Sequence, residues 1–320
     1  MTQRNRARRS CLSVPGTSPK MIDKARSLGA DQVFIDLEDA VPPPEKARAR
    51  EIIVASLNEG GWGERTRAVR INDLSTAWTH ADLVAIVEGA GPHLDTVILP
   101  KVEAPEQITW LDLTLTQLER STGLEVGRIG IEAMIETAGG LVHVDAIAAA
   151  SPRLETLIFG PADFMASINM KSLVVGEQPP GYDVGDAYHY ILMRILMAAR
   201  THDLQAVDGP YMQIRDLDGL RRTAARSAAL GFDGKWALHP GQLDVINELF
   251  SPAQEDYDHA ELILDAYEYS TSEAGGRRGA ATLGDEMIDE ASRKMAFVIA
   301  AKGRAAAMTR SQRFQVPVRP

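Results

Sequence analysis

The chain has 320 residues, of which 45% are hydrophobic and 24% are charged, a composition typical of a globular protein with a sizeable core. Its 34 Lys and Arg residues are outnumbered by 44 Asp and Glu residues, and the net charge of -10 argues against a general binder of nucleic acid or of anionic membranes. No apolar run approaches the roughly 18 residues that span a bilayer. We therefore expect a soluble, cytoplasmic protein.

The N-terminal residues raise two separate questions. Arg4, Arg6, Arg8 and Arg9 lie within the first nine residues, which contain no acid and lack the apolar segment of a secretory signal. They are interpreted either as a solvated tail or as a basic arm that helps to hold a phosphorylated ligand.

Cys11 is the only cysteine, so no intrachain disulfide can form, and its apolar surroundings favour buried packing over a reactive thiol.

The first elements in chain order are a strand, a turn and a helix. SCLSVP (10–15) is a short apolar run that is followed by Gly16. The next segment, TSPKMIDKARSLG (17–29), has Ser18 as a capping residue, Pro19 at the first helical position and a glycine at its end. This order indicates that a buried strand leads directly into a helix.

Apolar runs and helical segments then alternate as far as residue 250, as parallel sheets require. The count of eight strand-helix units predicts a (β/α)₈ TIM barrel in residues 1–250. A doubly wound open sheet would more often have five to seven strands and a glycine-rich phosphate fingerprint at its start. The residues expected at the carboxyl ends of the strands are Asp36, Glu38, Asp39, Arg70, Asn72, Lys101, Glu136, Asp163, Asp208 and His239.

Two segments exceed the minimal barrel. Residues 168–186 are rich in Gly and Pro and are expected to form a long loop or lid after the sixth strand. Residues 251–320 are expected to form a C-terminal helical extension, with helices at 252–270 and 287–308 joined by a glycine-rich connection. Because the barrel is already closed, this extension must pack outside it, over its mouth or against another subunit.

The strand-end residues predict a site for a metal and an anion. Glu136 and Asp163 each stand beside glycines, and two carboxylates without Cys or clustered His favour Mg²⁺ or Mn²⁺ over Zn²⁺. The alternative is that both acids form salt bridges with Arg70 or Lys101. Arg70 itself can offer a planar fork to a substrate carboxylate or pair with a neighbouring acid. His239 is either a base or metal ligand or, as we favour, a hydrogen-bonded structural residue.

These residues stand in motifs that resemble the citrate lyase β-subunit-like (HpcH/HpaI aldolase) family of CoA-thioester lyases, and within it the malyl-CoA lyases. The matching stretches are SVPGTSPKM, DLEDAVPPPEKARAR, VRIN, ILPKVE, IETAGG, FGPADFMAS, VDGP, GKWALHPGQ and GDEMIDEASRKMA. They follow the family's order over nearly the whole chain. The resemblance implies a (β/α)₈ barrel, Mg²⁺, and reversible cleavage of a β-hydroxyacyl-CoA to acetyl- or propionyl-CoA plus glyoxylate or pyruvate.

The resemblance also implies roles for single residues. Glu136 and Asp163 would hold the metal, and Arg70 would face the reacting oxygens. Asp289 would be the acid or base, supplied in family members by the neighbouring subunit, and a homotrimer or homohexamer is implied. The backbone expected to bind the oxo-acid carboxylate belongs to Gly160, Pro161, Ala162 and Asp163. The residues expected to orient the metal and its ligands are Asp36, Glu38, Asp39, Lys46 and Lys101. The residues expected near CoA are Pro15, Gly16, Thr17 and Lys20.

Two alternatives to a lyase remain. One is a thioesterase that hydrolyses malyl-CoA, and the other is a carrier-protein-dependent citrate lyase subunit. The tail with Asp289 favours a CoA-dependent lyase over the carrier-dependent subunit, because short members of the family lack this tail. Residues 170–190 depart from the pattern of malyl-CoA lyases, which leaves the acyl-chain specificity open.

Overall fold

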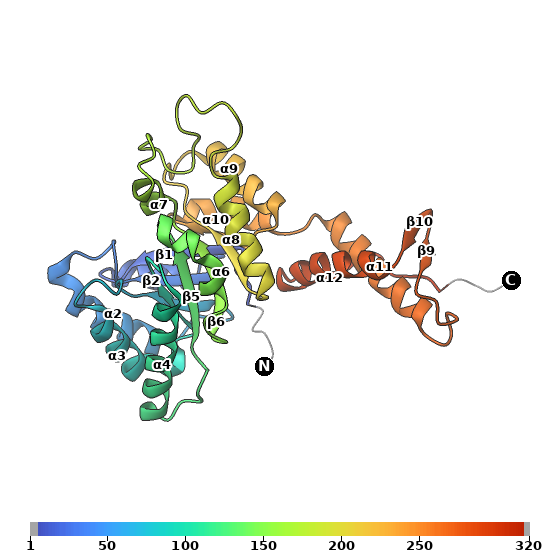
Figure 1. The fold of residues 1–320 in the computed structure, drawn as a ribbon. Coiled ribbons are helices and arrows are strands. Elements are labelled where there is room, and N and C mark those ends of the chain that lie inside the picture. Colours follow the sequence, from blue (N-terminus) through green and yellow to red (C-terminus); the bar gives the residue numbers. More distant parts are fainter. Residues whose placement is uncertain (1–5, 317–320) are drawn as a thin grey trace. The chain divides into compact units, whose positions relative to one another are not determined.

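The computed structural model describes residues 6–316. The chain divides between Phe250 and Ser251 into two compact units (Figure 1). Each unit has a hydrophobic core of its own. No helix within residues 6–316 is both long enough and apolar enough to cross a membrane.

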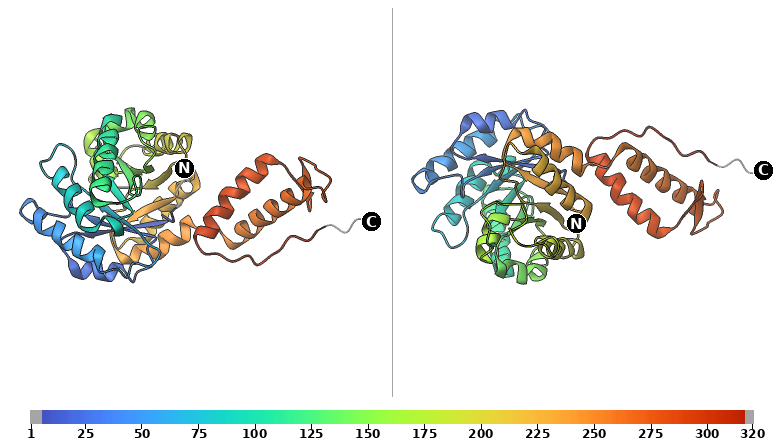
Figure 2. Two further views of the ribbon diagram at one scale, coloured as in Figure 1. Left: turned by 90° about the horizontal axis from the view of Figure 1, so that it is seen from below. Right: turned by 90° about the horizontal axis from the view of Figure 1, so that it is seen from above.

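The N-terminal unit is a closed barrel of parallel strands (Figure 2). Each strand pairs with the next one in the sequence, and β8 pairs with β1. The strands are β1 (Ser10–Pro15), β2 (Gln32–Asp36), β3 (Thr66–Arg70), β4 (Thr96–Leu99), β5 (Gly130–Ile135), β6 (Leu154–Phe159), β7 (Gln205–Asp208) and β8 (Gly234–Ala237). The predicted (β/α)₈ barrel is therefore confirmed.

Helices follow the strands and surround the barrel (Figure 2). They are α1 (Pro19–Ala25), α2 (Lys46–Asn58), α3 (Thr79–Ala90), α4 (Pro105–Thr122), α5 (Ala138–Val142), α6 (Val144–Ala148), α7 (Pro161–Ser167), α8 (His189–Thr201), α9 (Leu217–Leu230) and α10 (Leu243–Phe250), with 3₁₀ turns at Pro43–Glu45, Gly91–His93 and Pro240–Gln242. Proline occupies the first position of α1, α4 and α7, where its missing N–H breaks no helical hydrogen bond. The single helix expected between β5 and β6 is divided at His143 into α5 and α6.

One interior layer of the barrel takes a single side chain from every strand. Its members are Cys11, Phe34, Ala68, Ile98, Met134, Ile158, Val207 and Trp236. Cys11 is fully buried in this layer, and its burial raises the pKa of the thiol well above the usual value. The interpretation of Cys11 as packing rather than as a reactive thiol is thus confirmed.

The arginines that precede β1 lie at the amino ends of the strands. Arg8 is 1% exposed, and its guanidinium donates to Gln32 near the start of β2, at 2.9 Å, and to Glu155 in β6, at 2.6 Å. Arg9 donates to the carboxylate of Asp31. Both interpretations of the basic segment are therefore wrong for Arg8, which is buried and bound by acids at the amino ends of the strands. Arg9 is paired at the same end, with a partly exposed side chain. Arg4 lies outside the described residues.

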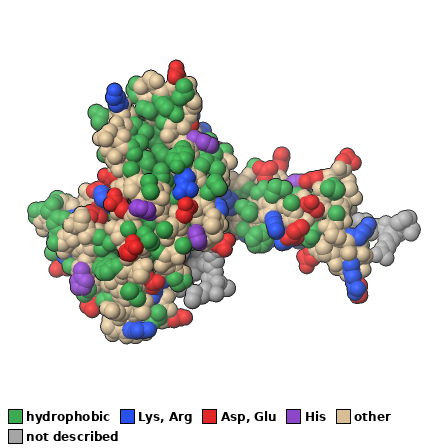
Figure 3. Space-filling model, viewed as in Figure 1, with side chains coloured by type: hydrophobic (Ala, Val, Ile, Leu, Met, Phe, Trp, Pro, Cys, Tyr) green, Lys and Arg blue, Asp and Glu red, His purple; other side chains and the backbone are tan. Residues whose placement is uncertain are grey.

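The segment after α7 forms the expected long loop. Residues 168–188 contain no helix or strand, and Leu173 is fully exposed while Val184 is 80% exposed. Tyr188 and Tyr211 anchor the loop: Tyr188 donates to the carbonyl of Glu177 at 3.1 Å and Tyr211 to the side chain of Glu177 at 3.1 Å. Hydrophobic side chains gather on the surface around the loop and α9, at the top of Figure 3.

The C-terminal unit is a helical pair with a small hairpin. Helices α11 (Gln254–Thr271) and α12 (Glu290–Ala305) pack against each other, and β9 (Ala281–Leu283) pairs antiparallel with β10 (Glu286–Ile288). The expected start of the last helix at Met287 is wrong, because Met287 lies in β10. The hairpin was not predicted: the segment is rich in Gly and its strands have three residues each, which is too short for a clear alternation.

Candidate active site

The carboxyl ends of five neighbouring strands bring most of the predicted site residues together. Asp36 ends β2 and stands beside Arg70 at the end of β3, which in turn pairs with Ile98 near the end of β4. Lys101 lies two residues after β4, Glu136 follows β5 directly, and Asp163 lies in the first turn of α7, after β6. Parallel pairing in this register places all of these residues on one rim of the barrel.

Glu136 is a buried carboxylate, and few contacts offset the cost of removing its charge from water. It is 2% exposed, and its Oε1 accepts a 2.7 Å hydrogen bond from the backbone N–H of Lys101. Burial raises the pKa of Glu136 to about 8; the charges of Glu38 and Asp163 add to the rise, while Lys101 opposes it. A cation beside Glu136 would relieve this cost by favouring the charged carboxylate.

Gly160 makes the space that Glu136 occupies. A Cβ atom on Gly160 would lie 2.3 Å from Oε2 of Glu136, far inside the contact distance of real atoms. The N–H of Gly160 donates to the carbonyl of Ile135 at 3.1 Å, and Pro161 has no N–H. Of the four residues whose backbone was expected to bind the oxo-acid, only Ala162 and Asp163 therefore retain an N–H for it.

Asp163 is the second predicted metal ligand, and its side chain is 41% exposed. Its Oδ2 lies 3.8 Å from Nζ of Lys101. Within residues 6–316 no group of three or more His, Cys, Asp or Glu side chains is arranged to hold a metal ion. Two carboxylates fit Mg²⁺, which keeps several waters and binds through one or two carboxylates plus its substrate.

Lys101 connects the acids of the rim. Its side chain forms an ion pair with Glu38 and its backbone N–H binds Glu136. Lys101 has a φ of 51°, in the left-handed region that few non-glycine residues adopt. Burial would lower the pKa of Lys101, but the hydrogen bond and charge of Glu38 outweigh it and raise the pKa, so the side chain stays a cation.

Arg70 is held by two acids. Its Nε and Nη2 donate to the two oxygens of Asp36 at 2.7 and 2.6 Å, and its Nη1 lies 2.6 Å from Oε2 of Glu38. Burial would lower the pKa of Arg70, but the charge of Asp36 outweighs it and raises the pKa. The pairing of Arg70 with these acids is thus observed, and its action on a substrate remains a prediction. Asp39 is largely exposed and lies 3.7 Å from Nη1.

A second network supports the rim from behind. Lys46 donates to the carbonyls of Leu37 and Glu38, at 2.6 and 2.8 Å, and to the side chain of Asn72 at 2.6 Å. Asp82 of α3 accepts from the backbone and side chain of Asn72 at 3.0 and 2.6 Å. No sequence pattern pointed to Asp82, because a buried acid on a helix cannot be told from an exposed one until its partner is known.

The remaining predicted residues lie apart from the acids or at other elements. Gly16 packs so closely on β2 that a Cβ atom would lie 2.7 Å from the carbonyl oxygen of Asp36, and Lys20 is exposed. The contacts of Pro15, Gly16, Thr17 and Lys20 do not test the predicted binding of CoA, so that role stays a prediction.

The ring of His239 accepts a hydrogen bond from the N–H of Gly241 at 3.0 Å, which is the structural role that we favoured.

Asp289 lies in the C-terminal unit, where it caps α12. Its Oδ1 accepts from the backbone N–H of Ser292 at 3.0 Å, and this hydrogen bond lowers the pKa of the carboxyl group. An Asp followed three residues later by a Ser is a helix-start signal, so the beginning of α12 could have been placed from these two residues. The lowered pKa favours the carboxylate, which is the form that accepts a proton.

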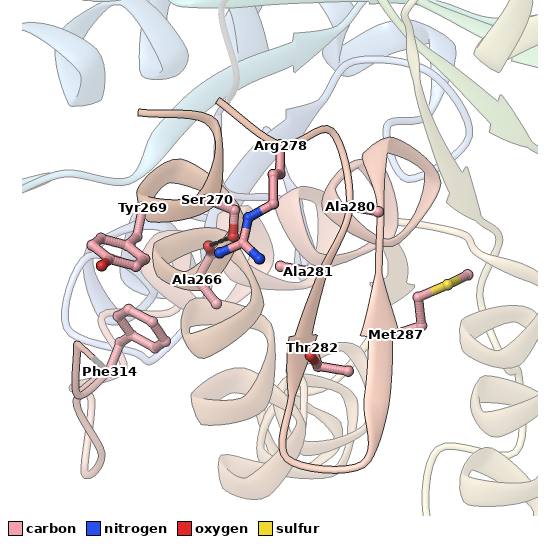
Figure 4. Close-up of a pocket in the computed structure, with 9 residues that line it drawn as sticks. All are labelled: Ala266, Tyr269, Ser270, Arg278, Ala280, Ala281, Thr282, Met287 and Phe314. Carbon is pink, nitrogen blue, oxygen red and sulfur yellow. Dashed lines mark hydrogen bonds between the residues drawn. The ribbon is translucent and has the colours of Figure 1, made fainter. Parts of the chain in front are cut away.

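The C-terminal unit also has a shallow cavity of its own (Figure 4). Its walls include Tyr269, Phe314 and Arg278, whose guanidinium points into the hollow in the close-up. None of the predicted catalytic or metal-binding residues lines it. The cavity therefore differs from the rim site in composition as well as in its position along the chain.

Comparison with known proteins gives three results of different kinds. Residues 9–240 match the HpcH/HpaI aldolase/citrate lyase family. The L-malyl-CoA/beta-methylmalyl-CoA lyase of Cereibacter sphaeroides is 38% identical over 302 residues, which cover 92% of this chain and 94% of that protein. The (3S)-malyl-CoA thioesterase of the same species is 35% identical over 260 residues, covering 81% of this chain and 83% of the relative.

Among solved structures, protein CitE from Mycobacterium tuberculosis in complex with magnesium, acetoacetate and coenzyme A has a similar fold. Its TM-score is 0.69 at 28% sequence identity, and the match covers 94% of this chain and 98% of CitE. The match extends beyond the 250 residues of the barrel unit into the C-terminal unit.

Proposed function

Because this chain belongs to the HpcH/HpaI aldolase/citrate lyase family, we propose that it is a Mg²⁺-dependent carbon-carbon lyase that cleaves a β-hydroxyacyl-CoA. Malyl-CoA, methylmalyl-CoA and citramalyl-CoA are the candidate substrates. The products would be acetyl-CoA or propionyl-CoA together with glyoxylate or pyruvate. The buried carboxylate of Glu136, on the same barrel rim as Asp163 and Arg70, is the observation that carries this proposal.

Glu136 and Asp163 are the proposed protein ligands of the metal. Glu136 is buried with one oxygen engaged by Lys101, and Gly160 leaves room beside the other oxygen. Bound there, Mg²⁺ would act as a Lewis acid on the oxygens of the substrate. Lys101 and Arg70 form ion pairs with Glu38 and so balance its charge. Glu38 would therefore orient its neighbours, while Glu136 and Asp163 bind the metal.

Arg70 is the proposed partner of the negative charge that forms on the thioester. When the carbon-carbon bond breaks, the substrate hydroxyl would release its proton to water at the rim and its carbon would become the carbonyl of the oxo-acid. The electron pair of the broken bond would move towards the thioester carbonyl and give an enolate. Asp36 engages two of the five N–H groups of Arg70 and holds one edge of the guanidinium. A preorganised cation of this kind stabilises the enolate without reorganising during the reaction.

Asp289 is the proposed acid or base. In the cleavage direction it would give a proton to the α-carbon of the enolate, and in the condensing direction it would remove that proton from the acyl-CoA. Its lowered pKa keeps the side chain as the carboxylate, which is the form needed at the start of the condensing direction. We propose that a neighbouring subunit supplies Asp289, which requires a homo-oligomer such as a trimer or hexamer.

A second candidate function is hydrolysis of malyl-CoA to malate and free CoA. The 35% identity to the (3S)-malyl-CoA thioesterase favours keeping it beside the lyase. The lyase ranks first because its match is longer, covering 92% of the chain against 81%.

A product assay tests both functions. The purified chain alone is incubated with malyl-, methylmalyl- or citramalyl-CoA, with Mg²⁺ or with a chelator. Glyoxylate or pyruvate formed together with an acyl-CoA supports the lyase. Free thiol without an oxo-acid supports the thioesterase, and no reaction with any of the three thioesters would contradict both. Activity of the chain by itself also excludes dependence on a carrier protein.

A further inference from the structure

Trp236 is the largest side chain of the interior layer and comes from β8. It is 4% exposed. Two strands, β1 and β2, separate β8 from β3 around the barrel, so Trp236 and Arg70 meet only across the interior. The ring of Trp236 belongs to the interior layer, and from there it can support a residue that another strand contributes.

The indole ring contacts the guanidinium of Arg70 and is backed by Phe34. The Cζ atom of Arg70 lies 5.5 Å from the centroid of the Trp236 ring, within the range of a cation-π interaction. The ring of Phe34 lies 4.2 Å from that of Trp236, at an interplanar angle of 37°. Arg70 thus lies against the ring of Trp236, and the tilted ring of Phe34 packs against Trp236 in turn.

The carboxylates and the indole restrain Arg70 in different ways. Asp36 binds one edge of the guanidinium through two hydrogen bonds, and Glu38 lies next to Nη1. These acids bind the N–H groups at the edge of the guanidinium, whereas an aromatic ring within cation-π distance supports the cation from another side. Without Trp236, Arg70 could move about its contact with Asp36 and lose its alignment with a ligand at the rim.

We propose that Trp236 is a positioning residue, which holds Arg70 in the orientation needed for the reaction. This inference rests on the proposed function, because that function assigns Arg70 to the developing enolate. Tryptophan binds cations better than the other aromatic residues do, and a desolvated site strengthens the interaction. The role belongs to the aromatic face, so another aromatic residue should retain most of it.

The indole N–H takes no part in fixing the ring. Trp236 Nε1 is buried and has no hydrogen-bond partner among the residues that the structure describes. Replacing the side chain therefore breaks no hydrogen bond of the indole within this part of the chain. The consequences of a substitution separate into lost packing, which any buried tryptophan would show, and lost support for Arg70.

Trp62 offers a matched control for the packing effect. It is 3% exposed, its Nε1 likewise has no partner within the described residues, and Cζ of Arg26 lies 5.2 Å from its ring centroid. Trp62 precedes β3 and so lies towards the amino end of that strand, away from the rim. A leucine at either position removes a similar aromatic ring from a similar environment.

The test compares Trp236→Leu, Trp236→Phe and Trp62→Leu in the full-length, Mg²⁺-loaded protein, with malyl-CoA as substrate. We expect Trp236→Leu to lower kcat about tenfold to thirtyfold, with KM changed less than about threefold. Trp236→Phe should restore kcat to within about threefold of the wild type. Trp62→Leu should leave kcat unchanged, although thermal unfolding should show that it destabilises the protein about as much as Trp236→Leu does.

Two outcomes would overturn the proposal: a kcat of Trp236→Leu equal to that of Trp62→Leu, or equal losses in Trp236→Leu and Trp236→Phe. The second would assign the effect to side-chain volume or to the indole N–H. The proposed function fails separately, because its failure is an inactive wild type with all three thioesters. An active wild type with an unaffected Trp236→Leu variant contradicts only the inference about Trp236.

Discussion

Gly160 and Glu136 approach each other so closely that a single methyl group between them would overlap the carboxylate: a Cβ on Gly160 would lie 2.3 Å from Oε2. Gly160→Ala should therefore displace Glu136 and weaken Mg²⁺ binding by about tenfold or more, since forced overpacking costs about 1–3 kcal/mol. Calorimetric titration with Mg²⁺ measures the change. Gly29→Ala is the control, because its Cβ would meet only Asn247, at 4.0 Å; equal affinities of the two variants would contradict the assignment.

The raised pKa of Glu136 predicts how the stability of the metal-free protein changes with pH. A carboxyl group with a folded-state pKa of about 8 and an ordinary value of 4.5 favours folding at low pH, and this contribution is lost as the pH rises towards 8. The loss should be roughly 3–5 kcal/mol. In buffer with a metal chelator at pH 8, Glu136→Gln should thus have a higher free energy of unfolding in urea than the wild type has. This difference in stability should become smaller as the pH is lowered towards 5.

Added Mg²⁺ supplies the control for this prediction. At pH 8 it should raise the stability of the wild type, because a ligand that binds only the folded state stabilises it. It should leave Glu136→Gln nearly unchanged. An equal response of both proteins would place the metal elsewhere.

Asp289→Asn should separate catalysis from folding. Asparagine is as good a helix cap as aspartate, so α12 should keep its start and thermal stability should stay close to that of the wild type. The amide cannot transfer the proton, and kcat should fall about 10²- to 10⁴-fold. Asp289→Ala should lose both the cap and the activity. An active Asp289→Asn variant would remove Asp289 from the mechanism.

Mixing inactive variants tests whether subunits share the site. Co-expression of Glu136→Ala with Asp289→Asn allows some sites to combine an intact rim with an intact tail from another chain. Partial recovery of activity is expected if a neighbour supplies Asp289. Recovery that never exceeds the sum of the separate variants would place both residues in one chain's site.

Lys235 and Asp208 form a buried ion pair between β8 and β7, with Nζ 2.6 Å from Oδ2. Ser227 of α9 donates to the same oxygen at 2.8 Å. Asp208→Asn should destabilise the protein by about 3–5 kcal/mol, because it leaves a buried ammonium without its counter-charge. Urea unfolding measures the loss. Arg221→Ala breaks a half-exposed pair with Glu248 and should cost less than about 1 kcal/mol.

The barrel and the rim could be predicted because both follow from local patterns in the sequence. The apolar runs gave eight strands, and strand order alone placed Glu136 and Asp163 on adjacent strand ends. The contacts of Arg8 could not be predicted, since Glu132 and Glu155 lie 124 and 147 positions away and a run of arginines looks like a solvated tail. The left-handed backbone of Lys101 likewise depends on tertiary contacts, because lysine has no preference for it.

The arginines before β1 have a further consequence for traffic to the active site. Arg8 and its partners lie at the amino end of the barrel, and the eight-residue layer from Cys11 to Trp236 fills the interior. Substrate, product and solvent protons would then share one entrance, at the carboxyl rim. An enolate formed at the rim would then meet water only from that one side, so the residues around the rim alone would decide how much water reaches the intermediate.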